Sequence, residues 1–312
     1  MIYTRNKLIT LDSKFGIQQN GTYKSNLLFN FRNLLSDEQH YIKSEVVVLN
    51  AQIPISFYVI NEYNNVLTIS GSGILTTSIT VDPGNYDANT LITELKSKFL
   101  AEGIIFSTIK INRNTGRLIF TATIFTNYQF SGSMIGVLGT TTSVISVSTI
   151  YKCIYPLNLL GIQKLSIRSD AFAVQSVSSV DFSSSNILIT IPVDMAPFSM
   201  ISYSSQLELN KNLLNVRLIN EIDIKIYDEN NNLVNFNNLD WNITLVITSE
   251  IKYDQPEISL NNILNKNVLE LQKKLEPPIE DYTDRRIDEI NNNPPINPIK
   301  LQNQKELDLL YY

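Results

Sequence analysis

The sequence has very little of the chemistry on which most enzymes depend. It contains one cysteine, Cys153, and one histidine, His40, among 312 residues. A single cysteine excludes a disulfide within the chain and a zinc site built from several cysteines. Any serine or cysteine nucleophile paired with histidine would have to use His40. We interpret His40, which follows Asp37-Glu38, as a solvated loop residue, and Cys153 as a buried, inert thiol beside a strand.

Charge and long hydrophobic runs are also scarce. Charged residues make up 18% of the chain and the net charge is −5. The acidic balance argues against direct nucleic-acid binding through the fold. No run of about 18 apolar residues is present, so no membrane span is expected. The first residues lack a basic region followed by an apolar core, so no signal peptide is expected either.

One acidic loop has part of a calcium-binding pattern. Asp228, Asn230 and Asn232 have the one-three-five spacing of a calcium loop. However, Leu233 stands where a glycine is required and Leu239 where a bidentate glutamate is required. The remaining acidic pairs fall in polar runs typical of solvated surfaces. The sequence therefore predicts no catalytic, cofactor-binding or metal-binding residues, no cofactor, and a protein that is not an enzyme.

Alternating apolar residues are the strongest positive signal. Ile222, Ile224 and Ile226 alternate with polar residues, an Asn-rich turn follows, and Ile243, Leu245 and Ile247 then alternate in the same way. This pattern predicts two half-buried antiparallel strands joined as a hairpin. About ten such short strands along the chain predict an all-β fold, a jelly-roll β-sandwich.

One segment breaks the strand pattern. Leu91, Ile92, Leu95 and Phe99 have helical spacing within residues 87–102. Asp87 precedes them as a plausible N-cap, because its carboxylate can accept from the free amides of the first turn. Gly103 follows at the position where a left-handed residue is favoured. The sequence therefore predicts one helix inserted into the sandwich.

The two ends of the chain differ in character from its middle. We interpret residues 1–22 as an N-terminal arm, residues 23–252 as the jelly-roll domain and residues 253–312 as an extended, partly helical tail. Within the tail, an amphipathic helix is expected at about residues 258–276. An unpartnered apolar stripe on such a helix predicts an assembly interface with another chain. The stripe consists of Leu260, Leu264, Val268, Leu271 and Leu275.

A series of phrases in order resembles the minor capsid proteins, the penton or vertex proteins, of virophages and nucleocytoplasmic giant DNA viruses. The resemblance covers about residues 24–250 and does not extend to the tail. The phrases are Pro54-ISFYVINEYNNVLTI, Ile79-TVDPGNYDANTLITEL, Asn114-TGRLIFT, Ile135-GVLG, Pro156-LNLLGIQKLSIRS, Ile189-TIPVDMAPFSMISYSS and Ile226-YDENNNLVNFNNLDWNITLVI.

The resemblance implies a structural capsid protein, a homopentamer that fills icosahedral vertices and contacts the major capsid protein. It implies a location in the virion, with assembly in the host cytoplasm, and the tail could contact other minor capsid proteins. Three alternatives remain open. The chain could be a minor capsid or spike subunit away from the vertex, a carbohydrate- or receptor-binding β-sandwich, or a glycosidase on a jelly roll.

Overall fold

The computed structural model describes residues 2–19, 23–35, 41–146, 148–172, 176–177, 184–205, 211–214, 219–252 and 271. The part from Met1 to Tyr253 is one compact unit. Within its described residues no helix is long and apolar enough to cross a membrane. This unit contains two hydrophobic cores, one inside a β-sandwich and one inside an insertion.

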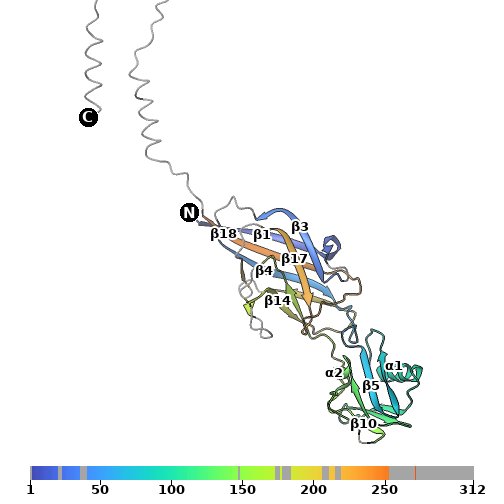
Figure 1. The fold of residues 1–312 in the computed structure, drawn as a ribbon. Helices are drawn as coiled ribbons and strands as arrows, with labels where there is room; N and C mark the ends of the chain where they lie inside the picture. Colours follow the sequence, from blue (N-terminus) through green and yellow to red (C-terminus); the bar gives the residue numbers. More distant parts are fainter. Residues whose placement is uncertain are drawn as a thin grey trace, which may run out of the picture. The chain divides into compact units, whose positions relative to one another are not determined.

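Eight strands build the sandwich, with one sheet in the order β1-β18-β4-β15 and the other in the order β14-β11-β17-β3. If these eight strands alone are numbered 1 to 8 along the chain, the first sheet has the order 1-8-3-6 and the second the order 5-4-7-2. This order is that of a jelly roll, so the predicted fold class is confirmed (Figure 1). The eight strands are β1 (Ile2–Asp12), β3 (Asn26–Leu35), β4 (Tyr41–Pro54), β11 (Lys164–Arg168), β14 (Ile187–Pro192), β15 (Met200–Ser204), β17 (Ile219–Tyr227) and β18 (Asn242–Lys252).

Short elements extend the two sheets. A 3₁₀ turn at Ser13–Phe15 follows β1, and β2 (Ile17–Gln18) then pairs with β3. β16 (Asn212–Leu214) pairs with β4 beside β15. β12 (Ser176–Val177) and β13 (Ser184–Ser185) form a separate two-stranded ribbon. β4 ends at Pro54, because proline has no amide proton to continue the ladder.

The interpretation of residues 1–22 as an arm is wrong for residues 2–12. These residues form β1, which pairs with β18 along its whole length, from Ile2 opposite Lys252 to Asp12 opposite Asn242. Ile9 and Leu11 are buried in the sandwich core. The first strand of the jelly roll is thus at the start of the chain, and the domain cannot begin at residue 23.

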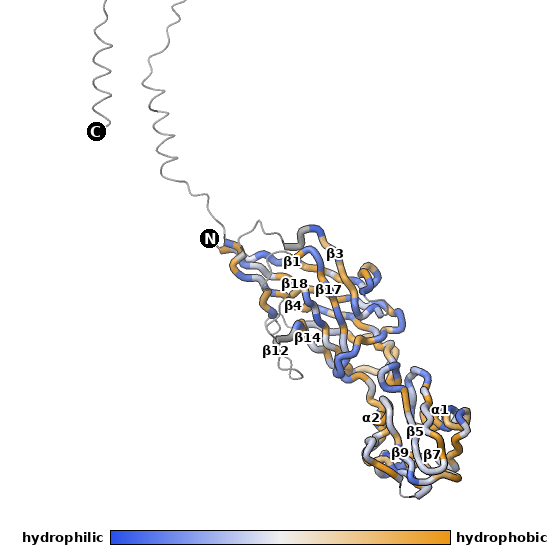
Figure 2. The backbone as a smooth tube through the Cα atoms, in the orientation of Figure 1, coloured by the Kyte–Doolittle hydropathy of each residue, from blue (hydrophilic) through white to orange (hydrophobic). Residues whose placement is uncertain are grey.

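The predicted hairpin between β17 and β18 is also wrong, although both strands exist. β17 pairs with β3 and β11, whereas β18 pairs with β1 and β4 in the opposite sheet. The alternation itself is correct, because Ile224 and Leu245 are buried between the sheets, and Figure 2 shows the alternating hydropathy of these strands. Alternation identifies a buried face, but it does not identify the strand that lies alongside.

The insertion between β4 and β11 is larger than the single helix that the sequence predicts. Two three-stranded sheets, in the orders β6-β5-β9 and β10-β8-β7, share a core with a helix. The helix α1 (Ala88–Ala101) is the predicted one. The other elements are β5 (Val66–Ser72), β6 (Ile74–Thr80), β7 (Phe106–Ile111), β8 (Leu118–Ala122), β9 (Thr126–Ser131), α2 (Ile135–Leu138) and β10 (Ile150–Lys152).

The ends of α1 follow from local sequence. The Asp87 carboxylate accepts hydrogen bonds from the amides of Asn89 and Thr90, both at 2.8 Å. The hydrogen bonds from Thr90, and to a smaller extent the one from Asn89, hold the pKa of Asp87 below its usual value, because they stabilise the ionised carboxylate. Gly103 has a φ of 74°, which permits the left-handed turn after the helix. The predicted cap and stop are therefore confirmed.

Aromatic rings fill the core of the insertion. Phe120 and Phe130 have ring centroids 4.8 Å apart, and the Tyr128 hydroxyl donates a hydrogen bond to the Phe120 carbonyl at 3.0 Å. A satisfied hydroxyl allows a tyrosine to be buried without loss of its hydrogen bond. The insertion thus has a hydrophobic core separate from that of the sandwich. Its central rings are Phe106, Phe120, Phe125, Tyr128, Phe130 and Tyr151.

Cys153 lies in this core and should not react in the folded protein. Burial raises the pKa of its thiol to about 12, since the thiolate would lose its hydration. At pH 8 we expect a thiol reagent to modify Cys153 only after denaturation. The fold favours the neutral thiol, so this group makes its full contribution to the free energy of unfolding below the unfolded pKa of about 8.5. As the pH rises from there towards 12, the thiol ionises in the unfolded chain but not in the folded one, and the contribution is lost. Rapid modification of the native protein would contradict the buried placement.

Candidate functional site

The described residues bring together no constellation suited to chemistry. Among them, no group of three or more His, Cys, Asp or Glu side chains could hold a metal ion. Asp228 instead builds a turn, because one carboxylate oxygen accepts from the amides of Asn230 and Asn232, both at 2.8 Å. The spacing that partly resembled a calcium loop therefore corresponds to a hydrogen-bonded Asx turn. His40 lies outside the described residues.

The predicted assembly stripe also lies almost wholly outside them. Leu260, Leu264, Val268 and Leu275 are not among the described residues, and Leu271 is helical and exposed. The stripe thus stays a prediction.

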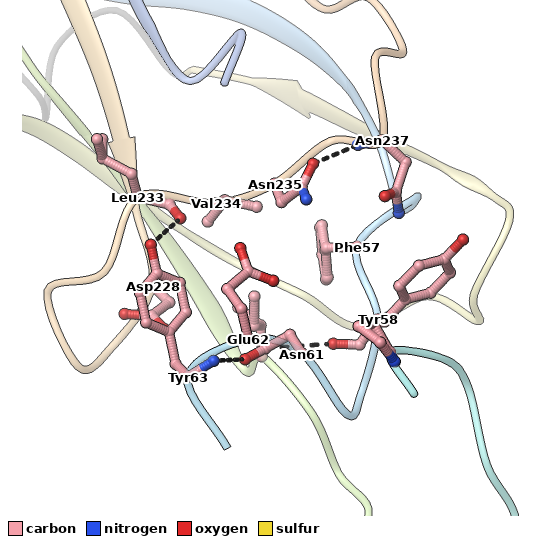
Figure 3. Close-up of a pocket in the computed structure, with 12 residues that line it drawn as sticks. Phe57, Tyr58, Asn61, Glu62, Tyr63, Asp228, Leu233, Val234, Asn235 and Asn237 are labelled. Carbon is pink, nitrogen blue, oxygen red and sulfur yellow. Dashed lines mark hydrogen bonds between the residues drawn. The ribbon is translucent and has the colours of Figure 1, made fainter. Parts of the chain in front are cut away.

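A cleft of about 230 Å³ lies where the chain passes between the sandwich and the insertion (Figure 3). Its wall on one side is formed by the segment that follows β4, including Phe57, Tyr58 and Tyr63. The other side is formed by the β17–β18 connection, including Val234 and Asn235. Aromatic rings beside amide groups are the side chains that sugar-binding sites use, so the cleft is a candidate ligand site.

Most polar groups that line the cleft are already occupied by contacts that hold its walls. The Asn61 side chain accepts from the Tyr63 amide at 3.0 Å, and the Tyr63 hydroxyl donates to the Leu233 carbonyl at 3.4 Å. Glu62 accepts from the Tyr23 hydroxyl at 2.6 Å. This bond and partial burial raise the pKa of Tyr23 to about 12. These hydrogen bonds therefore hold the loops around the cleft together, and they leave few polar side chains of the cleft for a ligand.

Large exposed apolar side chains suggest surfaces that contact other molecules. Leu8 on β1, Phe15 after β1 and Phe198 before β15 are strongly exposed, and they lie at the margins of the sandwich. β1 is also an edge strand eleven residues long, a type of edge that proteins usually cover or pair. Sequence reasoning missed these residues because an exposed apolar side chain has the same sequence signature as a buried one. The Pro197-Phe198 turn is the one signal that could have indicated Phe198.

These features define a jelly-roll protein with exposed edges and no assembled chemical site among the described residues. No protein-family model and no curated protein matches the sequence. Among solved structures, the chain is similar to the mavirus penton protein, with 13% identity, a TM-score of 0.42, and coverage of 80% of this chain and 99% of that chain. A chain of the Sputnik virophage structure is similar with 10% identity, a TM-score of 0.38, and coverage of 79% and 97%. At these low values the fold assignment rests on the strand order of the chain itself.

Proposed function

We propose that this chain is a structural subunit of a viral capsid, most specifically the pentameric penton that fills icosahedral vertices and contacts the major capsid protein. The supporting observation is the strand order of the sandwich, since viral capsid subunits are a principal use of the eight-stranded jelly roll. This is an analogy of fold, and the exposed edges add a physical reason for assembly. In this role the protein is a virion component assembled in the host cytoplasm.

Native mass spectrometry of the purified chain, together with its location in intact particles, tests this proposal. We expect a closed assembly of five 35.4 kDa subunits and density for the chain at the vertices. A chain that is monomeric and absent from purified virions would rule out a capsid role. A chain found in the shell but away from the vertices would instead identify a minor capsid or spike subunit.

Carbohydrate or receptor binding is a second candidate, favoured by the aromatic rings of the cleft. The Tyr58 ring lies at the cleft in Figure 3, where it could stack on a sugar. A glycan array with the wild-type protein and Tyr58→Ala distinguishes the two functions. Binding that Tyr58→Ala abolishes would support the receptor role, whereas an array without any hit would count against it.

The tail should be needed for assembly rather than for folding. A chain truncated after Tyr253 retains all strands of the sandwich and the insertion, because β18 ends at Lys252. We expect it to be soluble, with unchanged circular dichroism, but to enter capsids poorly because it lacks the apolar stripe. A matched variant, Leu264→Asp in the full chain, should show the same defect. If the truncated chain is insoluble, the stripe belongs to the domain core.

A further inference from the structure

The turn before β15 displays an unusual apolar projection. Phe198 has an exposed fraction of 80% and a φ of 67°, in the left-handed region that a bulky residue rarely adopts. Two hydrogen bonds of 2.8 Å fix this turn, from the Phe198 amide to the Ile55 carbonyl and from the Ile55 amide to the Ser199 carbonyl. Strain that surrounding bonds maintain at a surface position is typical of functional segments. We name the exposed side chains of Met195, Phe198 and Met200 the Phe198 knob.

A hollow of about 420 Å³ lies at the opposite margin of the sandwich. The hollow lies between β1 and β3. β2 pairs with β3 only at Leu27 and Leu28, so it leaves the rest of the edge of β3 uncovered. Phe29 and Phe31 form its apolar floor, and Phe15, with an exposed fraction of 82%, stands at its rim. We name this hollow the Phe15 groove. It is lined by Thr10, Asp12, Phe15, Phe29, Asn30, Phe31 and Asn242.

The knob and the groove lie at nearly the same height along the strands. Across the β1-β18-β4-β15 sheet, Asp12 is opposite Asn242, Asn242 is opposite Gln52, and Gln52 is opposite Ser202. Ser202 is two residues from Met200 of the knob, and Asp12 lines the groove. A head-to-tail contact closes into a ring only when successive copies are related by rotation without translation. Two complementary features at equal height on opposite edges satisfy this condition for an axis parallel to the strands.

Charge bears on the orientation of such a contact. Asp194 is exposed beside Met195 of the knob, and Lys14 is exposed beside Phe15 of the groove. The Asp12 carboxylate lines the groove and keeps its negative charge, although it accepts a hydrogen bond from the Lys14 amide at 3.0 Å. A knob that enters the groove brings Asp194 near Lys14, whose positive charge offsets that of Asp12. Two knobs that met would instead place one Asp194 near another, so charge favours the head-to-tail orientation.

From these features we infer that a second copy of this chain occupies the Phe15 groove. The Phe198 knob of one copy enters the groove of the next, and repetition around an axis parallel to the strands closes a ring. The inference rests on the proposed function, because it specifies the contact that would build the oligomer. An exposed aromatic residue that enters an apolar hollow is the type of anchor that dominates interface energies.

Disulfide trapping tests the contact directly. Met195→Cys combined with Asn30→Cys places one thiol on the knob and one at the groove while Phe198 is kept, and buried Cys153 leaves little background. Mild oxidation should give a ladder of linked subunits that ends at one closed species on a non-reducing gel. The control pairs Met195→Cys with Leu75→Cys, an exposed position in the insertion, and should give no ladder. Dimers formed by Met195→Cys alone, or no linkage by the test pair, would overturn the inference.

Variants that keep the fold measure the strength of the contact. Phe198→Gly removes the ring and suits a positive φ, so we expect an intact monomer whose subunit dissociation constant rises by about 30-fold. Asp194→Lys should also weaken assembly, and Lys14→Asp in the same chain should restore it. Leu75→Ser should change nothing. An oligomer that persists unchanged in Phe198→Gly refutes this contact and leaves the capsid role intact, whereas a wild-type chain absent from capsids refutes the proposed function itself.

Discussion

Replacing Leu11 with aspartate should unfold the sandwich. Leu11 is fully buried opposite Ile243, in the strand that sequence analysis alone interprets as part of an arm. The change removes leucine packing worth about 2–5 kcal/mol and places a carboxylate where its burial costs several kcal/mol more. Since domains of this kind are stable by only about 5–15 kcal/mol, most of the free energy of unfolding would be lost. Circular dichroism and the fluorescence of buried Trp241 report the loss.

Leu8→Asp is the matched control for this prediction. Leu8 lies on the same strand three residues earlier, but its side chain points to the other face and has an exposed fraction of 67%. The same chemical change there should leave the fluorescence maximum of Trp241 and the unfolding midpoint nearly unchanged. If Leu11→Asp behaved as Leu8→Asp does, β1 would not be an integral strand of the jelly roll.

Phe120→Ala should destabilise the insertion by about 3–5 kcal/mol while the sandwich stays folded. Phe120 is fully buried and contacts Phe106, Phe130 and Tyr151 in edge or tilted geometry. Removal of its ring leaves a cavity that the surrounding strands cannot fill. Because the insertion has its own core, its unfolding can be local. Hydrogen exchange should show loss of protection in β5–β10 before any loss in β4 or β18.

The position of Trp241 makes this separation measurable. Trp241, the only tryptophan in the chain, is buried in the sandwich core. Its ring packs edge-on against Phe29, with the two ring centroids 6.1 Å apart. Its fluorescence should therefore stay unchanged while Phe120→Ala unfolds the insertion. Ile124→Ala, at an exposed position near the same core, is the control and should have little effect. A single cooperative transition that includes Trp241 would mean that the two cores unfold together.

Local signals of the sequence predict local structure well in this chain. The helix α1 begins after Asp87 and ends before Gly103 because capping and the left-handed turn depend on a few neighbouring residues. The buried faces of β17 and β18 follow in the same way from period-two alternation.

The candidate surfaces could not be predicted in this way. Phe198 and Phe15 are exposed, whereas Phe29 and Phe236 are buried. Their sequence neighbours do not separate the two groups, because exposed Phe15 follows Lys14 and buried Phe236 lies between two asparagines. Exposure depends on which segments cover a side chain, and these segments come from distant parts of the chain. The Phe15 groove, for example, combines residues of β1, β3 and the start of β18.

Composition, alternation and capping act within a few residues, so they were enough to predict the class of the fold, the helix of the insertion and the scarcity of catalytic side chains. Three features became visible only in the folded chain: residues 2–12 are the first strand of the jelly roll, β17 and β18 lie in opposite sheets, and the insertion has a core of its own. Local patterns do not predict these features because strand pairing joins segments far apart in the chain. β1 and β18, at opposite ends of the domain, complete one sheet by backbone hydrogen bonds that residue type does not encode.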